Sequence, residues 1–189
     1  VGYILPSNLN GFNGHVMYAM GENASGLFNS DDGTHMGFRV GYRNGPWNMA
    51  YASGTTKYTT AAKIANDYEQ TNFAINYQMG QAKLMFLTNV NKIGATKTQT
   101  EMFGTQYNVS TGQVRIASTK LKATGVANDA TQWAVGYVHN LSKRTVLFTN
   151  YSKVDNAGTG KQFTVGGGNN VTTAGGSSTG YEFGVRHSF

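Results

Sequence analysis

The chain contains no cysteine and only 2 prolines, and 13% of its 189 residues are Asp, Glu, Lys or Arg. The absence of cysteine excludes a disulfide framework and any metal site built from thiolates. No apolar run approaches the ~18 residues that a membrane-spanning helix requires. The densest apolar patches, Leu84–Leu87 and Val146–Phe148, are short. The sequence therefore excludes a disulfide-rich scaffold and a helical membrane protein.

Recognisable sites for chemistry are also missing. Residues 176–180 fit the pattern G-x-S-x-G, but this motif needs a strand before it and a helix after it, and here a glycine-rich loop leads into a strand. The four histidines are never spaced as metal ligands. The net charge of +6 has no clustered basic run behind it, so we do not expect nucleic-acid binding. The sequence predicts no enzyme, no cofactor and no metal site.

The last ten residues, Gly180–Phe189, carry the clearest pattern. Tyr181, Phe183, Val185, His187 and Phe189 alternate with polar or small residues, which is typical of a strand with one apolar face. The sequence stops on an aromatic residue of the apolar parity. Aromatic rings collect at membrane interfaces, so this strand is expected to meet a membrane, although the edge strand of a soluble β-sandwich has the same alternation.

Similar alternation recurs along the whole chain, and 25 glycines separate or interrupt the segments. Eleven strands are predicted, the first of them partial: 1–5, 12–21, 34–43, 47–57, 67–77, 82–91, 99–108, 113–122, 131–139, 144–154 and 180–189. The facing of 144–154 stays open, because both parities hold apolar residues.

The connections are expected to alternate in length. Short ones follow Leu5, Arg43, Tyr77, Asn108 and His139, and long ones follow Gly21, Lys57, Asn91, Lys122 and Val154. Short turns at one end and long loops at the other are typical of outer-membrane barrels, whose tilted strands need about 9–11 residues to cross. We therefore predict an all-β fold, a transmembrane antiparallel up-and-down β-barrel. Since single-chain bacterial barrels have even strand numbers, residues 1–189 are interpreted as the C-terminal part of a longer barrel.

Two segments resemble a known family: residues 133–145, Trp-Ala-Val-Gly-Tyr-Val-His-Asn-Leu-Ser-Lys-Arg-Thr, and the ending Gly184–Phe189. They are similar to the trimeric general-diffusion porins of Gram-negative bacteria, of the type found in Burkholderia, Comamonas and Neisseria relatives. The resemblance implies a sixteen-stranded barrel, a homotrimer in the outer membrane, and contact with its lipid and lipopolysaccharide. It also implies that an inward-folded third loop and about five strands would precede Val1. Within the ending, Tyr181, Phe183, Val185 and Phe189 would form the signal read by the outer-membrane assembly machinery.

All five arginines lie in predicted strands or at their short-turn ends. Facing lipid, each would cost about 2–4 kcal/mol near the midplane, whereas facing a water-filled lumen each would attract anions. The candidate pore-lining residues are Arg39, Arg43, Lys83, Arg115 and Arg186. The alternative is that the arginines pair with carboxylates of the wall, namely Glu69, Glu101 or Glu182.

The sequence thus predicts a passive channel for small hydrophilic solutes and ions that prefers anions. A barrel that serves as an adhesin or structural anchor is one alternative. A soluble β-sandwich that acts as a binding module is another.

Overall fold

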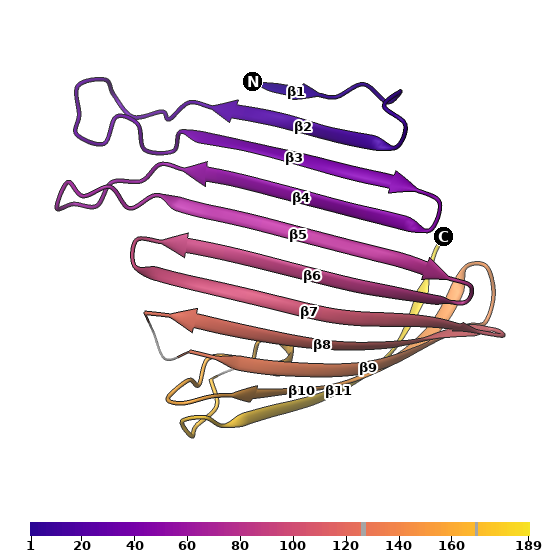
Figure 1. The fold of residues 1–189 in the computed structure, drawn as a ribbon. Helices are drawn as coiled ribbons and strands as arrows, with labels where there is room; N and C mark the ends of the chain where they lie inside the picture. The colour runs from indigo at the N-terminus through magenta and orange to yellow at the C-terminus, as the bar shows by residue number, and fades with distance from the viewer. Residues whose placement is uncertain (126–127, 169) are drawn as a thin grey trace.

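The computed structural model describes residues 1–125, 128–168 and 170–189, which contain one antiparallel sheet of eleven strands in sequence order (Figure 1). The strands are β1 (Gly2–Ile4), β2 (Phe12–Ala19), β3 (His35–Asn44), β4 (Trp47–Thr56), β5 (Tyr68–Met79), β6 (Ala82–Ile93), β7 (Thr96–Val109), β8 (Gly112–Thr124), β9 (Ala130–Asn140), β10 (Thr145–Asn156) and β11 (Ser177–His187). Each pairs with its sequence neighbours, which confirms the expected all-β up-and-down topology.

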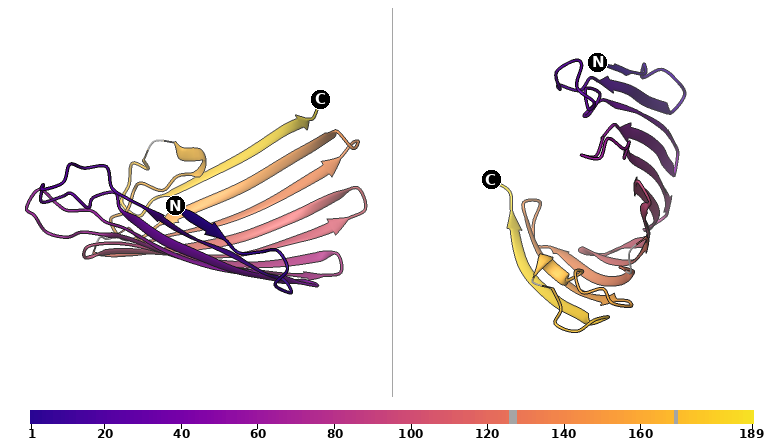
Figure 2. Two further views of the ribbon diagram at one scale, coloured as in Figure 1. Left: turned by 90° about the horizontal axis from the view of Figure 1, so that it is seen from above. Right: turned by 90° about the vertical axis from the view of Figure 1, so that its left-hand side faces the viewer.

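The sheet is strongly curved. Seen end-on, it forms an open trough with β1 at one edge and β11 at the other (Figure 2). A short helical turn, η1 (Val165–Gly167), belongs to the loop between β10 and β11, and it lies on the concave side (Figure 2). In the described part of the chain, no helix has both the length and the apolar character needed to cross a membrane.

Alternation along the strands places two different sets of side chains on the two faces. Phe163 and Thr164 of the inward loop share a hollow of about 140 Å³ with Thr119 of β8 and Gln132 of β9. Thr119 and Gln132 therefore face the concave side. Directly paired residues lie on the same face of a sheet, and successive residues of a strand lie on opposite faces. Starting from Thr119 and Gln132, the register therefore assigns each strand residue to the concave or the convex face.

The convex face is apolar and aromatic. Ring pairs bridge neighbouring strands there, with centroids 4.8 Å apart for Phe12 and Tyr42 and 4.4 Å apart for Trp47 and Tyr77. Exposed apolar side chains on this face include Val16, Phe38, Val40, Tyr51, Leu84, Phe103, Tyr107, Ile116, Trp133, Val135 and Tyr181. A continuous apolar surface of this size is not stable in water. The convex face therefore requires an apolar surrounding, as a lipid bilayer provides.

The connections largely follow the predicted asymmetry, with one error. The short connections after β1, β3, β5, β7 and β9 lie at one end, and residues 20–34, 57–67 and 157–176 form long loops at the other (Figure 1). The long loop predicted over residues 92–98 is wrong, because β6 and β7 are joined by Gly94 and Ala95 alone. Gly94 adopts a φ of 54°, which a tight hairpin turn needs. The alternation continues into this polar segment, and β7 and β8 extend to 14 and 13 residues.

The facing of β10, which the sequence left open, follows from its register. Leu147 and Tyr151 face the convex side, whereas Val146 and Phe148 face the concave side. The ring of Phe148 lies against Gly184 of β11. An inward aromatic residue is accommodated here because its partner has no side chain.

Candidate functional site: the concave wall

The five predicted pore-lining residues all lie on the concave face. Arg39 and Arg43 belong to β3, Lys83 to β6, Arg115 to β8 and Arg186 to β11. Among the described strand residues of this face, Glu182 is the single acidic side chain. The strand acids Glu69, Glu101 and Asp155 face the convex side, and the remaining acids lie in loops. The described strands of the concave wall therefore carry five basic groups and one acidic group.

Two of these arginines share a hollow. Arg115 and Arg186 line a space of about 270 Å³ together with Phe148 and Asn150. The Nε of Arg115 donates to Gln113 Oε1 at 2.6 Å, and Asn150 Nδ2 donates to Glu182 Oε2 at 3.0 Å. The glutamate is thus occupied by an amide, while both guanidinium groups are open to the space in front of the wall.

Arg39 lies in a separate group. Neighbouring strands are about 4.8 Å apart, so the five steps from β3 to β8 separate Arg39 from Arg115 by roughly 24 Å along the sheet. The Nη1 of Arg39 donates to Asn13 Oδ1 at 2.6 Å. The positive charge of the wall is therefore distributed in at least two places.

The alternative interpretation of the arginines as members of wall ion pairs is not supported by the contacts. Within the described residues, the ion pairs are Lys57–Asp31, Lys92–Glu69 and Lys153–Asp155, and none includes an arginine. Glu101 accepts from Gln99 Nε2 at 2.9 Å. Because none of the described carboxylates forms an ion pair with an arginine, the charge of the arginines is available to mobile anions.

Neutral polar groups cover the wall between the charged regions. Tyr68 donates to Asn91 Oδ1 at 3.0 Å, Asn91 donates to Asn89 Oδ1 at 2.7 Å, and Asn89 in turn donates to Asn72. This chain of hydrogen bonds runs across β5 and β6 on the concave face. A wall of amides and hydroxyls is wetted by water without attracting ions of either sign strongly.

The loop between β10 and β11 folds onto this wall. Asn156, whose exposure is only 6%, donates to the carbonyls of Phe163 and Gly176 at 2.9 Å each and accepts from the Phe163 N–H at 3.1 Å. The Val165 N–H donates to Ser178 Oγ at 3.1 Å. One buried side chain thus holds both ends of the inward segment against the sheet.

Comparison with known proteins agrees with this inside-out arrangement of polar and apolar faces. Residues 1–159 match the Gram-negative porin family. The chain belongs to this porin family. It is 31% identical over 200 residues to outer membrane porin protein 32 of Delftia acidovorans, covering 100% of this chain and 56% of that protein.

Solved porins have the same fold as this chain. An anion-selective porin from Comamonas acidovorans superposes with a TM-score of 0.84 at 29% identity, covering 100% of this chain and 58% of that one. Salmonella typhi OmpF, solved with daunomycin, gives a TM-score of 0.66 at 14% identity, covering 98% of this chain and 60% of OmpF. The porin chain therefore spans somewhat more than half the length of these relatives. As a family member it is located in the Gram-negative outer membrane.

Three of the predicted assembly residues lie on the convex face of the porin's β11, and Phe189 follows the strand. Tyr181, Phe183 and Val185 are exposed by 89%, 73% and 60%, and Phe189 is fully exposed. The His187 and Phe189 rings meet edge to face at 5.0 Å. These residues are separate from the concave wall, so any role they have in assembly is spatially distinct from conduction.

The matched relatives are named as porins. Ser178, the serine of the G-x-S-x-G pattern, lies in β11 and not at a strand-to-helix turn. No cluster of three or more potential metal-ligating side chains occurs among the residues that could be placed.

Sequence reasoning missed two parts of the site. His15 and His35 join Arg39 on the concave wall, although 20 residues separate them along the chain. The inward fold of residues 157–176 was not foreseen either. The scattered apolar residues Phe163 and Val165, in an otherwise polar loop, were the available signal for a segment that packs on something.

Replacing Asn156 by alanine should release the inward loop. The part-buried carbonyl and N–H of Phe163 would lose this partner, at about 1–3 kcal/mol for each group left unsatisfied. We expect amide exchange at Val165 and Val171 to accelerate at least tenfold, with the rest of the sheet unchanged. The exposed Asn140 at the opposite end is the matched control, and Asn140→Ala should leave loop exchange as it was. Equal exchange in Asn156→Ala and the parent would show that the loop is held by other contacts.

Proposed function

We propose that this chain forms part of a passive, water-filled channel for small hydrophilic solutes and ions, with a preference for anions. The observation that carries the proposal is the excess of five basic groups over one acidic group on the concave wall, with no arginine in an ion pair among the described residues. Such a wall concentrates mobile anions within about a Debye length, ~8–10 Å at physiological salt. The anion-selective relative from Comamonas supports the same direction.

The channel is proposed to need strands in addition to those described. Both β1 and β11 have one unpaired edge, and unpaired backbone groups in lipid cost several kcal/mol each. About five further strands and an inward-folded third loop before Val1 would complete a sixteen-stranded barrel, with residues 1–189 as its C-terminal part.

Residues 1–189 alone are therefore expected not to give stable conductance steps in a planar bilayer. The complete porin should give discrete steps under the same conditions, with a chloride-favouring reversal potential. Steps from residues 1–189 alone would overturn the proposal of missing strands. A complete barrel that inserts without conducting would instead favour the adhesin or anchor alternative, which its long loops would serve.

Three partners are proposed for the assembled porin. It is expected to form a homotrimer, and its ending is expected to be read by the assembly machinery. At the long-loop end, Lys92, Lys97, Lys120 and Lys122 project from the convex face of β6 to β8, where they would contact the phosphates of lipopolysaccharide. Native mass spectrometry of the porin in mild detergent should show three chains with retained lipopolysaccharide. A single chain without lipid would count against both partners.

A further inference from the structure

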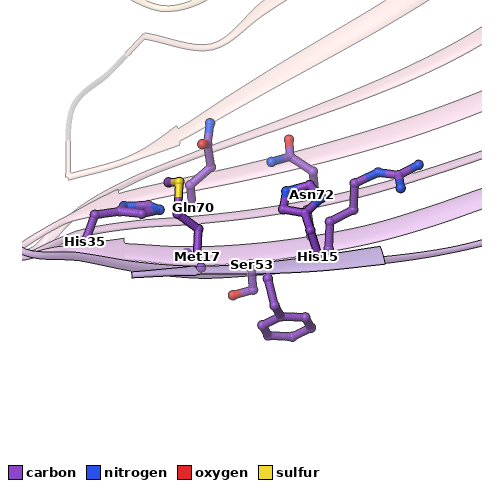
Figure 3. Close-up of a pocket in the computed structure, with 11 residues that line it drawn as sticks. His15, Met17, His35, Ser53, Gln70 and Asn72 are labelled. Carbon is purple, nitrogen blue, oxygen red and sulfur yellow. The ribbon is translucent and has the colours of Figure 1, made fainter. Parts of the chain in front are cut away.

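A second hollow on the concave wall lies apart from the one shared by Arg115 and Arg186. It has a volume of about 180 Å³ and spans β2 to β5. His15, Met17, His35, Gln70 and Asn72 project together on one side of the sheet, with Ser53 on the opposite side (Figure 3). Arg39 lines the same hollow. The hollow thus combines one permanent cation with two imidazoles and two amides.

Glycines lie beneath two of these side chains. A Cβ at Gly37 would lie 2.8 Å from His35 Nε2, and a Cβ at Gly41 would lie 3.1 Å from Arg39 Nη2. The imidazole therefore lies over bare backbone in the hollow, and the guanidinium lies over Gly41 at its border, where Asn13 accepts from Nη1. His35 is oriented further by a 2.8 Å hydrogen bond between its Nδ1 and Thr56 Oγ1. These groups are held in place before any solute arrives, which lowers the entropic cost of binding.

Charge in this hollow is positive and unopposed. His15 pairs directly with Arg39, so their Cβ atoms are about 4.5–5.5 Å apart. The residues facing this pair from β1, β4 and β5 are Ile4, Ala52 and Asn72, all neutral, and Arg43 lies further along the same face of β3. Among the described lining residues, the charged or titratable groups are Arg39, His15 and His35.

We propose that this hollow is a proton-linked binding site for the oxyanion group of a passing solute, a phosphate or a carboxylate. The guanidinium of Arg39 provides planar N–H donors suited to such a group, and His15 provides a second donor from the neighbouring strand. Gln70 and Asn72 donate from the adjacent wall, and His35 adds charge at the far end. The proposal rests on the channel function proposed above and adds a solute class and a regulation to it.

Protonation and anion binding favour each other at this site. His15 lies directly opposite Arg39 in the register, so a protonated His15 would add a second positive charge to the hollow. An oxyanion between the two groups would be attracted to both. By reciprocity, a bound anion favours protonation of His15, and protonation tightens anion binding. Because an ordinary imidazole titrates near pH ~6.5, binding is expected to strengthen as the pH falls through this range.

The test uses sulfate, a tetrahedral oxyanion that stays doubly charged across the range, as an open-channel blocker of the complete porin. Block of chloride current is measured at pH ~5.5 and ~8, on either side of the ordinary imidazole value. The apparent affinity of sulfate should rise about tenfold at the lower pH, within the usual range of such couplings. His15→Gln should abolish most of this rise, and Arg39→Gln should weaken block at both pH values.

His139 on the convex face is the matched control, and His139→Gln should keep the full pH dependence. If the porin conducts with a chloride preference but block does not depend on pH, His15 or Arg39, this site does not exist while the channel function stands. Histidine NMR provides a readout that does not need conduction. Sulfate should shift the titration of His15 in the refolded porin toward higher pH and leave His139 unchanged, and an unshifted His15 would overturn the proposal.

Discussion

Replacing Arg39, Arg115 and Arg186 together by glutamine is expected to remove most of the channel's preference for chloride. After this change, the described strands carry two basic groups, Arg43 and Lys83, and one acidic group, Glu182, on the concave face. The reversal potential across a potassium chloride gradient should therefore move close to zero. The parent's own preference should weaken as salt rises, because the Debye length falls from ~10 Å at 0.1 M to ~3 Å at 1 M.

The convex lysines provide the control for this experiment. Lys97, Lys120 and Lys122 carry the same total charge on nearby strands but face away from the concave wall. Replacing these three by glutamine should leave selectivity unchanged, which separates the charge of the wall from the net charge of the protein. A parent that prefers potassium, or a triple arginine variant with an unchanged reversal potential, would assign selectivity to segments outside this chain.

Deleting Phe189 is expected to lower the amount of inserted porin several-fold while leaving single-channel conductance unchanged. Ser188 donates its N–H to the Arg144 carbonyl at 2.9 Å, and in the described chain no hydrogen bond from Phe189 extends this ladder. The ring itself is fully exposed. Removing the residue therefore costs the folded sheet little, so a large effect must arise during assembly.

A conservative variant separates the aromatic ring from the chain length. Phe189→Tyr keeps an aromatic terminus and should restore insertion, whereas Phe189→Ser should behave like the deletion. Inserted porin is measured by its amount in outer-membrane fractions, and conductance is measured on the purified protein. Normal insertion without any aromatic terminus would refute the proposed role of Phe189.

The strands were predictable because each face contacts a different solvent. Lipid on one side and water on the other require strict alternation, and residues such as Phe38 and Arg39 show it directly in the sequence. The same rule failed where both sides are water. Around Gly94 the alternation of Lys and Thr is polar on both faces, so the β6–β7 hairpin resembled a loop. The facing of β10 was equally hidden, because Phe148 points inward over Gly184.

The basic residues of the concave wall could be predicted from the sequence, but their grouping in space could not. The sequence indicated that Arg115 and Arg186 face water, yet only the pairing of β8 through β11 brings them to one hollow. The group of His15, His35 and Arg39 depends on the register between β2 and β3 in the same way. The inward loop was indicated in the sequence by Phe163 and Val165 alone, since its position depends on contacts of side chains with backbone groups, those of Asn156 with Phe163 and of Ser178 with Val165.

The unbroken register from β2 to β11 also determines which changes of length this chain can tolerate. Removing one residue from the middle of β5 would invert every side chain between the deletion and the next turn, placing Asn72 or Asn76 in lipid and Phe73 or Ile75 in water. Removing two adjacent residues would keep the parity and shorten the span. Loops 20–34 and 57–67 impose no such constraint, so natural length variation, epitope tags and inserted peptides belong there.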